Sequence, residues 1–191
     1  AITTFLTCAL SRLTDYCCSL ATWNPTNENV GHLFQRQGIP MAWDFVETNA
    51  VHGKLSYTVA CEWVASSLAG LPDDSDVARV LQIDARKANV QFDTPPVIST
   101  DPPYYDNIVY ADLSDYFYVW LRRNIKDVYP DLGSTISVPK EEELVATPYR
   151  HGGKAKAEEH FLTGMTSAIS SLARQSSSSF PATIYYAFKQ S

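Results

Sequence analysis

The chain has 191 residues, of which 45% are hydrophobic, and this is enough apolar material for one domain with a core of its own. Its formal net charge of −6 excludes a surface that is basic all over, although a local basic groove for nucleic acid is compatible with it. No apolar run is long enough to span a bilayer, and the first residues do not read as a signal peptide, so we expect a cytoplasmic protein with no membrane contact.

Several basic residues are candidates for such a groove, although a solvated surface charge is the ordinary explanation for each of them. They are Arg122, Arg123, Lys126, Lys140, Arg150, His151, Lys154 and Lys156.

The first seventy residues are predicted to be mainly helical. Residues 1–22 contain no proline or glycine and carry apolar side chains at helical spacing. Residues 57–69 show the same periodicity until Gly70 ends it. Between these helices, residues 30–37 form a helical or irregular piece, and residues 40–48 form a further short helix.

Beyond residue 72 the pattern changes to an alternation of strands and helices, which implies an α/β fold with a parallel, Rossmann-like sheet. In chain order we predict strands over 80–84 and 97–100, a helix over 110–128, a mobile loop over 130–157, a helix over 158–174, a serine turn at 176–179 and a strand over 182–188.

The four cysteines, Cys8, Cys17, Cys18 and Cys61, contain no Cys-x-x-Cys pair and so lack the spacing of a zinc site. Cys8 and Cys17 fall within a predicted helix, where buried free thiols are expected. We therefore expect no metal site.

The most informative segment is the turn after the strand at 97–100, which reads Asp101-Pro102-Pro103-Tyr104. Two consecutive prolines remove two backbone N–H donors and fix two φ angles, so the loop presents carbonyl oxygens beside a carboxylate and a ring. That surface suits a planar group with an exocyclic amine. In an open α/β sheet, ligands also bind at the carboxyl ends of the strands. An ordinary turn is the alternative explanation.

An Asp-Pro-Pro-Tyr motif after a strand resembles the signature of methyltransferases that act on the amino groups of adenine or cytosine in DNA. The runs Thr100–Asn107 and Tyr110–Asp115 are similar to the large prokaryotic adenine-specific DNA methylases that often carry a zinc ribbon elsewhere. The stretch Arg36–Asn49 also resembles that group, and the tail Tyr185–Lys189 extends the match.

This resemblance implies a partial Rossmann-like S-adenosylmethionine-dependent methyltransferase sheet. We expect a helical portion over residues 1–72 and part of the catalytic domain over residues 73–191.

The resemblance also implies the chemistry of the motif. Asp101 and the carbonyl of Pro102 or Pro103 would accept the two N–H bonds of the amine, and Tyr104 would stack on the base. The nitrogen, drawn toward tetrahedral geometry, would attack the methyl group of S-adenosylmethionine in line. The base would have to be flipped out of a duplex or presented single-stranded. Tyr105, Asp106 and Asn107 would then line the rim of the substrate pocket.

Asp84 is the candidate cofactor-binding residue, because similar methyltransferases have an acid at the end of the preceding strand that contacts the adenine ring of the cofactor. Ile83 stands where the family has glycine, and a helix N-cap is an equal alternative for Asp84.

The other acidic and amide residues of the matching stretches have plainer explanations. Asn107 or Asp112 could cap the following helix, and Asp115 could line its solvated side. Asp44, Glu47 and Asn49 are expected to have structural roles.

No Gly-x-Gly loop for the cofactor occurs among the eight glycines. In the resembled family this element lies far upstream, so we expect the chain to be a fragment whose partners are DNA and the remainder of the full-length methylase. The isolated chain is expected to bind S-adenosylmethionine weakly or not at all, and to be inactive. The alternatives are methylation of cytosine N4, an RNA base or a protein glutamine, and a non-catalytic DNA-binding or assembly module.

Overall fold

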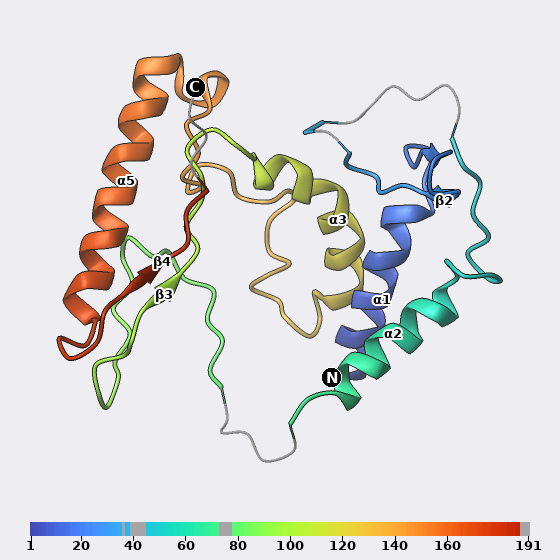
Figure 1. The fold of residues 1–191 in the computed structure, drawn as a ribbon, viewed down its shortest axis with the longest axis horizontal. Coiled ribbons are helices and arrows are strands. Elements are labelled where there is room, and N and C mark those ends of the chain that lie inside the picture. Colours follow the sequence, from blue (N-terminus) through green and yellow to red (C-terminus); the bar gives the residue numbers. More distant parts are fainter. Residues whose placement is uncertain (36, 39–44, 73–77, 188–191) are drawn as a thin grey trace. The chain divides into compact units, whose positions relative to one another are not determined.

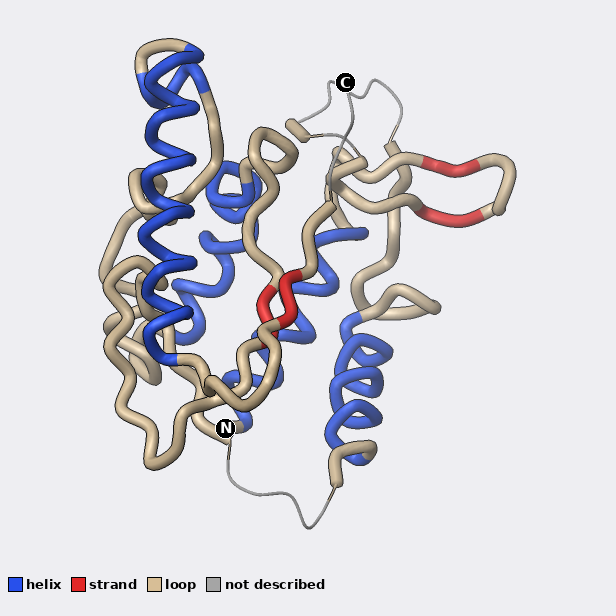
Figure 2. The backbone as a smooth tube through the Cα atoms, turned by 60° about the vertical axis from the view of Figure 1, so that its left-hand side comes forward, coloured by secondary structure: helices blue, strands red, loops and turns tan. Residues whose placement is uncertain are grey.

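The structure, a computed structural model, describes residues 1–35, 37–38, 45–72 and 78–187. Helices and two small two-stranded sheets make up its regular elements (Figures 1 and 2). They fall into two compact units, Ala1–Asp76 with Tyr110–Lys140, and Val77–Val109 with Glu141–Ser191. Among the described helices, none combines the length and the apolar character needed to cross a membrane.

Three helices build the first unit, and each contributes a buried alanine. α1 (Ile2–Tyr16) packs against both α2 (Tyr57–Ala69) and α3 (Tyr110–Ile125). Ala9, Ala60 and Ala111, one on each helix, are at most 5% exposed. A side chain that ends at Cβ lets neighbouring helices approach closely, which is why these positions lie inside the bundle.

The ends of α2 agree with its predicted bounds. Ser56 precedes the helix, and its side-chain oxygen accepts the N–H of Val59, as an N-cap residue does. Gly70 follows the last turn. The helix predicted over 57–69 is therefore confirmed, because local capping signals and apolar periodicity coincide there.

After α1 the chain forms a short antiparallel hairpin of β1 (Trp23–Asn24) and β2 (Asn29–Val30). The side chain of Asn24 accepts two backbone N–H groups of the connecting turn. Leu33 then folds back and is fully buried, and its N–H is shared by the backbone carbonyl and the carboxylate of Asp15.

The second unit contains a two-stranded parallel sheet. β3 (Ser99–Thr100) pairs with β4 (Thr183–Ile184), with Ser99 opposite Thr183. The hydrogen bonds continue beyond the paired residues: the N–H of Tyr185 donates to the carbonyl of Thr100 over 2.8 Å. The strands predicted at 97–100 and 182–188 are thus both present and pair with each other, but each is shorter than predicted.

The long helix α5 (Lys154–Gln175) runs alongside this strand pair (Figures 1 and 2) and follows the short helix α4 (Pro148–His151). Ala146, Ala157 and Phe161 form a buried cluster in this unit, and Tyr105 and Met165 pack against it.

Four predictions of secondary structure need correction. The helix predicted over residues 1–22 ends at Tyr16, and residues 17–22 form turns and irregular chain. Residues 80–84 are not a strand, because the described part of the chain supplies no strand beside them, and Val80 is 92% exposed. The predicted loop over 130–157 ends earlier, since α4 and the first turn of α5 lie within it. Of residues 30–37, Val30 ends β2 and the other described residues are irregular, which agrees with the irregular alternative. The described residues 45–48 of the helix predicted over 40–48 are also irregular.

The fold class is therefore a mixture of helices and small sheets. The predicted division at residue 72 stays a prediction. In the structure, α3 packs with the first unit, whereas the motif that precedes it along the chain belongs to the second.

Candidate functional site

The Asp-Pro-Pro-Tyr motif occupies the turn directly after β3, at the carboxyl end of this strand. Asp101 is exposed, and Pro102, Pro103 and Tyr104 are half-buried. The Tyr104 hydroxyl donates a hydrogen bond of 2.7 Å to Oδ1 of Asp101. The carbonyl of Tyr104 accepts the N–H of Asn107 over 2.9 Å, which closes the turn. The carboxylate is thus oriented by the aromatic residue of its own motif.

Tyr186, which follows β4 in the chain, contacts the motif loop at two points. Its hydroxyl oxygen accepts the backbone N–H of Tyr105 over 3.2 Å. Its ring meets that of Tyr104 edge to face, with centroids 5.3 Å apart and planes at 78°. Sequence analysis identifies Tyr186 only as part of the tail that resembles the methylases, and the two consecutive tyrosines in this tail are the available signal.

Tyr105, predicted at the pocket rim, packs inward. Its ring lies edge to face against Phe161 of α5 at 5.3 Å, and its carbonyl accepts the N–H of Ala146 over 2.8 Å. Burial, with a smaller contribution from the charges of Glu158 and Asp106, raises the pKa of its hydroxyl. Tyr105 therefore anchors the loop to the core cluster of the unit.

The two residues after it keep positions compatible with a rim. Asp106 and Asn107 are both exposed in the turn between the motif and α3. Their predicted contact with a substrate stays a prediction.

Asp84 lies in a separate turn, where its carboxylate is engaged by a neighbour. Both oxygens accept hydrogen bonds from the Arg86 guanidinium at 2.8–3.1 Å, and Oδ1 also accepts the Arg86 backbone N–H at 2.9 Å. These bonds lower the pKa of Asp84 to about 2. The alternative of a helix N-cap is not supported, because a turn and no helix follows Asp84, and the carboxylate bonds the backbone two residues on within that turn.

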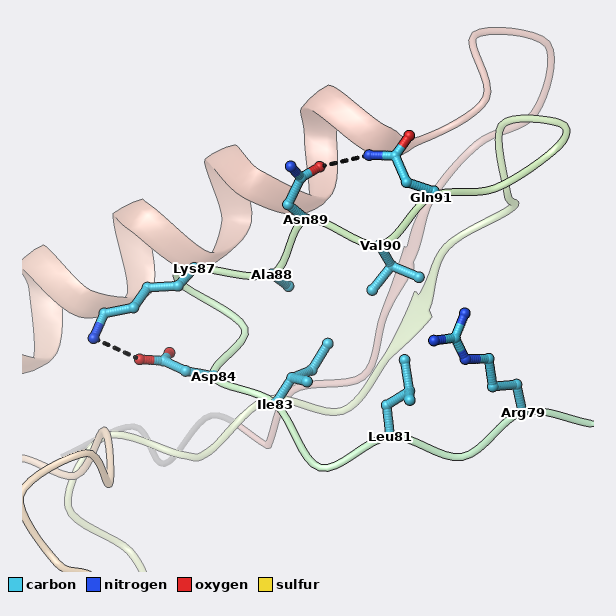
Figure 3. A pocket seen from close by; sticks show the side chains of 9 residues that line it. All are labelled: Arg79, Leu81, Ile83, Asp84, Lys87, Ala88, Asn89, Val90 and Gln91. Atoms are coloured by element: carbon cyan, nitrogen blue, oxygen red, sulfur yellow. Dashed lines mark hydrogen bonds and ion pairs between the residues drawn. The ribbon is translucent and has the colours of Figure 1, made fainter.

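A hollow of about 530 Å³ opens beside Asp84 (Figure 3). Leu81, Ile83 and Val90 supply apolar side chains, and Asn89 and Gln91 join their side-chain amides by a hydrogen bond of 3.2 Å. This volume could take a ring of modest size. The carboxylate that would have to recognise a cofactor is already bound to Arg86, so the described residues alone do not provide a complete cofactor site.

A second hollow, of about 620 Å³, lies between this turn and α5. Its basic residues are Arg86, Lys87 and Lys156. Acidic groups offset them, because Asp84 binds Arg86 and Glu159 lies in the same lining. No residue of the motif lines either of these two hollows.

Several candidates for a basic groove are engaged in ion pairs. Lys140 binds Asp115 over 2.7 Å, and Arg150 binds Glu143 over 2.6 Å in a largely buried pair. Asp115 also accepts the N–H of Val138 at 2.8 Å. It therefore links α3 to the segment after this helix, a role additional to the predicted position on a solvated face.

The remaining candidates have structural positions. Asp112 lies in the first turn of α3, where a negative charge is favourable. Asn49 accepts the N–H groups of Val51 and His52 in a turn, and Glu47 is exposed. Asp44 lies outside the described residues, as do Arg36 and the end of the tail from residue 188.

Within the described residues, no group of three His, Cys, Asp or Glu side chains is placed to hold a metal ion. All four cysteines are free thiols. Burial of Cys8 was a wrong prediction, because this thiol lies on the exposed side of α1, and Cys17 is half-buried at the end of the helix.

Comparisons of the chain with models of protein families, with curated proteins and with solved structures found no match. The functional interpretation of the candidate site is therefore argued from its residues and their geometry alone.

Proposed function

We propose that this chain is part of the catalytic domain of a DNA amino-group methyltransferase, and that the motif loop binds the exocyclic amine of a base, adenine N6 in the first place. The supporting observation is the position of the motif: an exposed carboxylate, two prolines and a tyrosine directly follow a strand that has a parallel partner. The carboxyl end of a parallel strand is a common place for ligands.

The finer fold proposed for the chain is a Rossmann-like sheet, of which β3 and β4 are two strands. Strands that run parallel need a crossover connection, and α5 lies on the chain between these two. Such crossover units build the sheets of α/β proteins.

The amine would be held by the oxygen atoms of the loop. A carboxylate has two oxygens with about four acceptor positions, so Asp101 can keep the Tyr104 hydroxyl on Oδ1 while Oδ2 accepts one N–H of the amine. The carbonyl of Pro102 or Pro103 would accept the second N–H. Preorganised acceptors of this kind stabilise the charge that develops on the nitrogen as it becomes a nucleophile.

The half-buried ring of Tyr104 would give the base a face to stack on. Stacking of a base on an aromatic side chain contributes about 1–3 kcal/mol and is tolerant of sequence. A base inside a duplex cannot reach such a loop, so the substrate would be an unpaired or flipped base.

S-adenosylmethionine would supply the methyl group when bound. Of the described residues, only Asp84 and its hollow are candidates for contact with it, and the rest of that site is expected from the remainder of the methylase. Because the chain resembles prokaryotic DNA methylases, we propose that the activity is cytoplasmic.

The test is transfer of a tritiated methyl group by the natural protein that carries this chain. Single-stranded and duplex oligonucleotides with adenine as the acceptor base are compared with versions in which N6-methyladenine replaces it, and with cytosine-only versions. We expect Asp101→Ala to lower transfer by about a hundredfold or more, as loss of one preorganised polar group does in other enzymes.

Asp93→Ala is the matched control, because Asp93 is an exposed aspartate of the same unit and lies outside the motif. Equal transfer by the wild-type protein and Asp101→Ala would end the assignment of Asp101. Transfer to RNA or to a glutamine peptide in place of DNA would redirect the proposal to that substrate, and DNA binding without transfer would support a non-catalytic module.

A further inference from the structure

Tyr186 is exposed over 42% of its surface, yet its interactions concentrate on one segment. In the described part of the chain, its hydrogen bond goes to the Tyr105 N–H and its ring contact goes to Tyr104. An aromatic residue that served only the core would bury its ring. Tyr186 instead lays a partly solvated ring and its hydroxyl against the loop that carries the motif.

The pairing of β3 with β4 explains how a residue 81 positions from Tyr105 reaches it. Thr100 pairs with Ile184, and the Tyr185 N–H donates to the carbonyl of Thr100. The chain on both strands continues in the same direction, so Tyr186 emerges beside the turn that follows Thr100. This position is a direct consequence of the parallel register.

The composition of the motif reduces the number of hydrogen bonds that can hold the loop. Pro102 and Pro103 have no backbone N–H, so neither can donate a hydrogen bond that holds the loop. The N–H of Tyr105 comes shortly after them, and its acceptor is the Tyr186 hydroxyl.

Tyr186 also acts on Asp101 indirectly, through Tyr104. The Tyr186 ring supports the Tyr104 ring, and the Tyr104 hydroxyl donates to the Asp101 carboxylate. A displacement of Tyr186 would therefore disturb both the backbone of the loop and the position of the Asp101 carboxylate.

We propose that Tyr186 is a positioning residue of the amine-binding loop, which holds Tyr105 through its hydroxyl and Asp101 through the ring of Tyr104. This inference rests on the function proposed above. Tyr186 itself touches no reacting atom in this scheme, and acts by limiting the conformations open to the loop.

Two substitutions separate the two contacts. Tyr186→Phe keeps the ring and removes the acceptor, and Tyr186→Leu removes both. Tyr185→Phe is the matched control, because the Tyr185 ring is 60% exposed and only its backbone N–H bonds to β3.

Methyl transfer is measured with the natural protein that carries the chain, with kcat and KM determined separately. We expect kcat to fall about two- to tenfold in Tyr186→Phe, the range that loss of one hydrogen bond gives. Loss of the ring contact should lower it by a further two- to tenfold or so in Tyr186→Leu. Tyr185→Phe should leave kcat unchanged.

The ring contribution should depend on Tyr104. In a Tyr104→Ala background, Tyr186→Leu and Tyr186→Phe should have the same kcat, because the partner ring is gone. A general loss of folded protein would lower activity in every background by the same factor, so it would not produce this pattern.

Hydrogen exchange of the peptide that spans residues 101–107 is a second readout, independent of activity. We expect faster exchange in Tyr186→Phe and Tyr186→Leu, and wild-type exchange in Tyr185→Phe. Unchanged exchange and unchanged kcat in Tyr186→Leu would overturn the positioning role. A wild-type protein that transfers no methyl group would instead overturn the proposed function and with it this role in catalysis, while exchange would still report whether Tyr186 holds the loop.

Discussion

The Tyr104 hydroxyl donates a 2.7 Å hydrogen bond to the Asp101 carboxylate, so the last residue of the motif orients the first. This contact places the acid and the ring of the proposed amine site in one hydrogen-bonded unit. It also separates two roles of Tyr104 under the proposed function: the hydroxyl binds Asp101, and the ring would stack on a base.

We expect Tyr104→Phe and Tyr104→Ala to have different effects on methyl transfer by the natural protein that carries the chain. Phenylalanine keeps the stacking face and loses the bond to Asp101, which should lower kcat about two- to tenfold with little change in KM. Alanine also loses the face, so KM for the oligonucleotide should rise about fivefold to a hundredfold. Identical kinetics for the two variants would show that the ring has no role in binding the base.

Substitutions of Tyr105 will show whether it anchors the loop or binds substrate. Its ring packs edge to face on Phe161, so Tyr105→Ala should lower the free energy of unfolding by about 1–3 kcal/mol. Tyr105→Phe keeps the packing and should change stability by less than about 0.5 kcal/mol. Chemical denaturation measures both. A stable Tyr105→Ala variant with impaired DNA binding would return Tyr105 to the predicted rim.

The ion pair of Asp84 predicts a specific titration. The Arg86 guanidinium holds the pKa of Asp84 at about 2, so Arg86→Gln should return this pKa toward its ordinary value of 3.8. Lys87→Gln is the control: Lys87 lies 3.8 Å from the carboxylate and contributes least, so this change should have a small effect. Carboxyl chemical shifts followed by NMR from pH 1.5 to 6 measure all three proteins.

The same pair fixes the sign of a pH dependence. Because folding lowers the pKa of Asp84, its contribution to stability is present above pH 3.8 and is lost as the pH falls through about 2. Asp84→Asn should therefore show a flatter decline of stability at low pH than the wild-type chain. Parallel declines would contradict the pairing.

Tyr116 on α3 predicts a dependence at alkaline pH. Burial, followed by the neighbouring Cys18, raises its pKa to about 12, and its hydroxyl donates to the carbonyl of Thr14 at 3.0 Å. The unfolded chain loses this proton from about pH 10, so the group's contribution is complete below pH 10 and is lost as the pH rises toward 12.

Tyr116→Phe should remove that component from the pH dependence of unfolding. The difference in slope should stay below about 1.4 kcal/mol per pH unit, because this single group changes the number of bound protons by at most one. Tyr118→Phe, which changes another half-buried tyrosine of the same helix, serves as the control. Equal slopes in wild type and Tyr116→Phe would show that Tyr116 titrates normally.

The strongest local signals of the sequence predicted their elements well. The helix over 57–69 has a capping serine, regular apolar spacing and a terminal glycine, and the structure has it at the same bounds. The strand before the motif and the strand at the end of the chain are also found, shortened to two residues each. Residues 80–84 have a strand's composition without a strand beside them, and a single sequence does not tell where a pairing partner lies.

The chain's own residues determine the chemistry available in the motif. The order acid, proline, proline, tyrosine removes two N–H donors and supplies acceptors and a ring wherever the loop lies. Tertiary structure alone decided which residues hold it: Tyr186, 81 positions from Tyr105, reaches the loop through the parallel pairing of β3 with β4, and the Tyr105 ring packs against Phe161. These contacts depend on register and packing between distant segments, and periodicity along one segment carries no information about them.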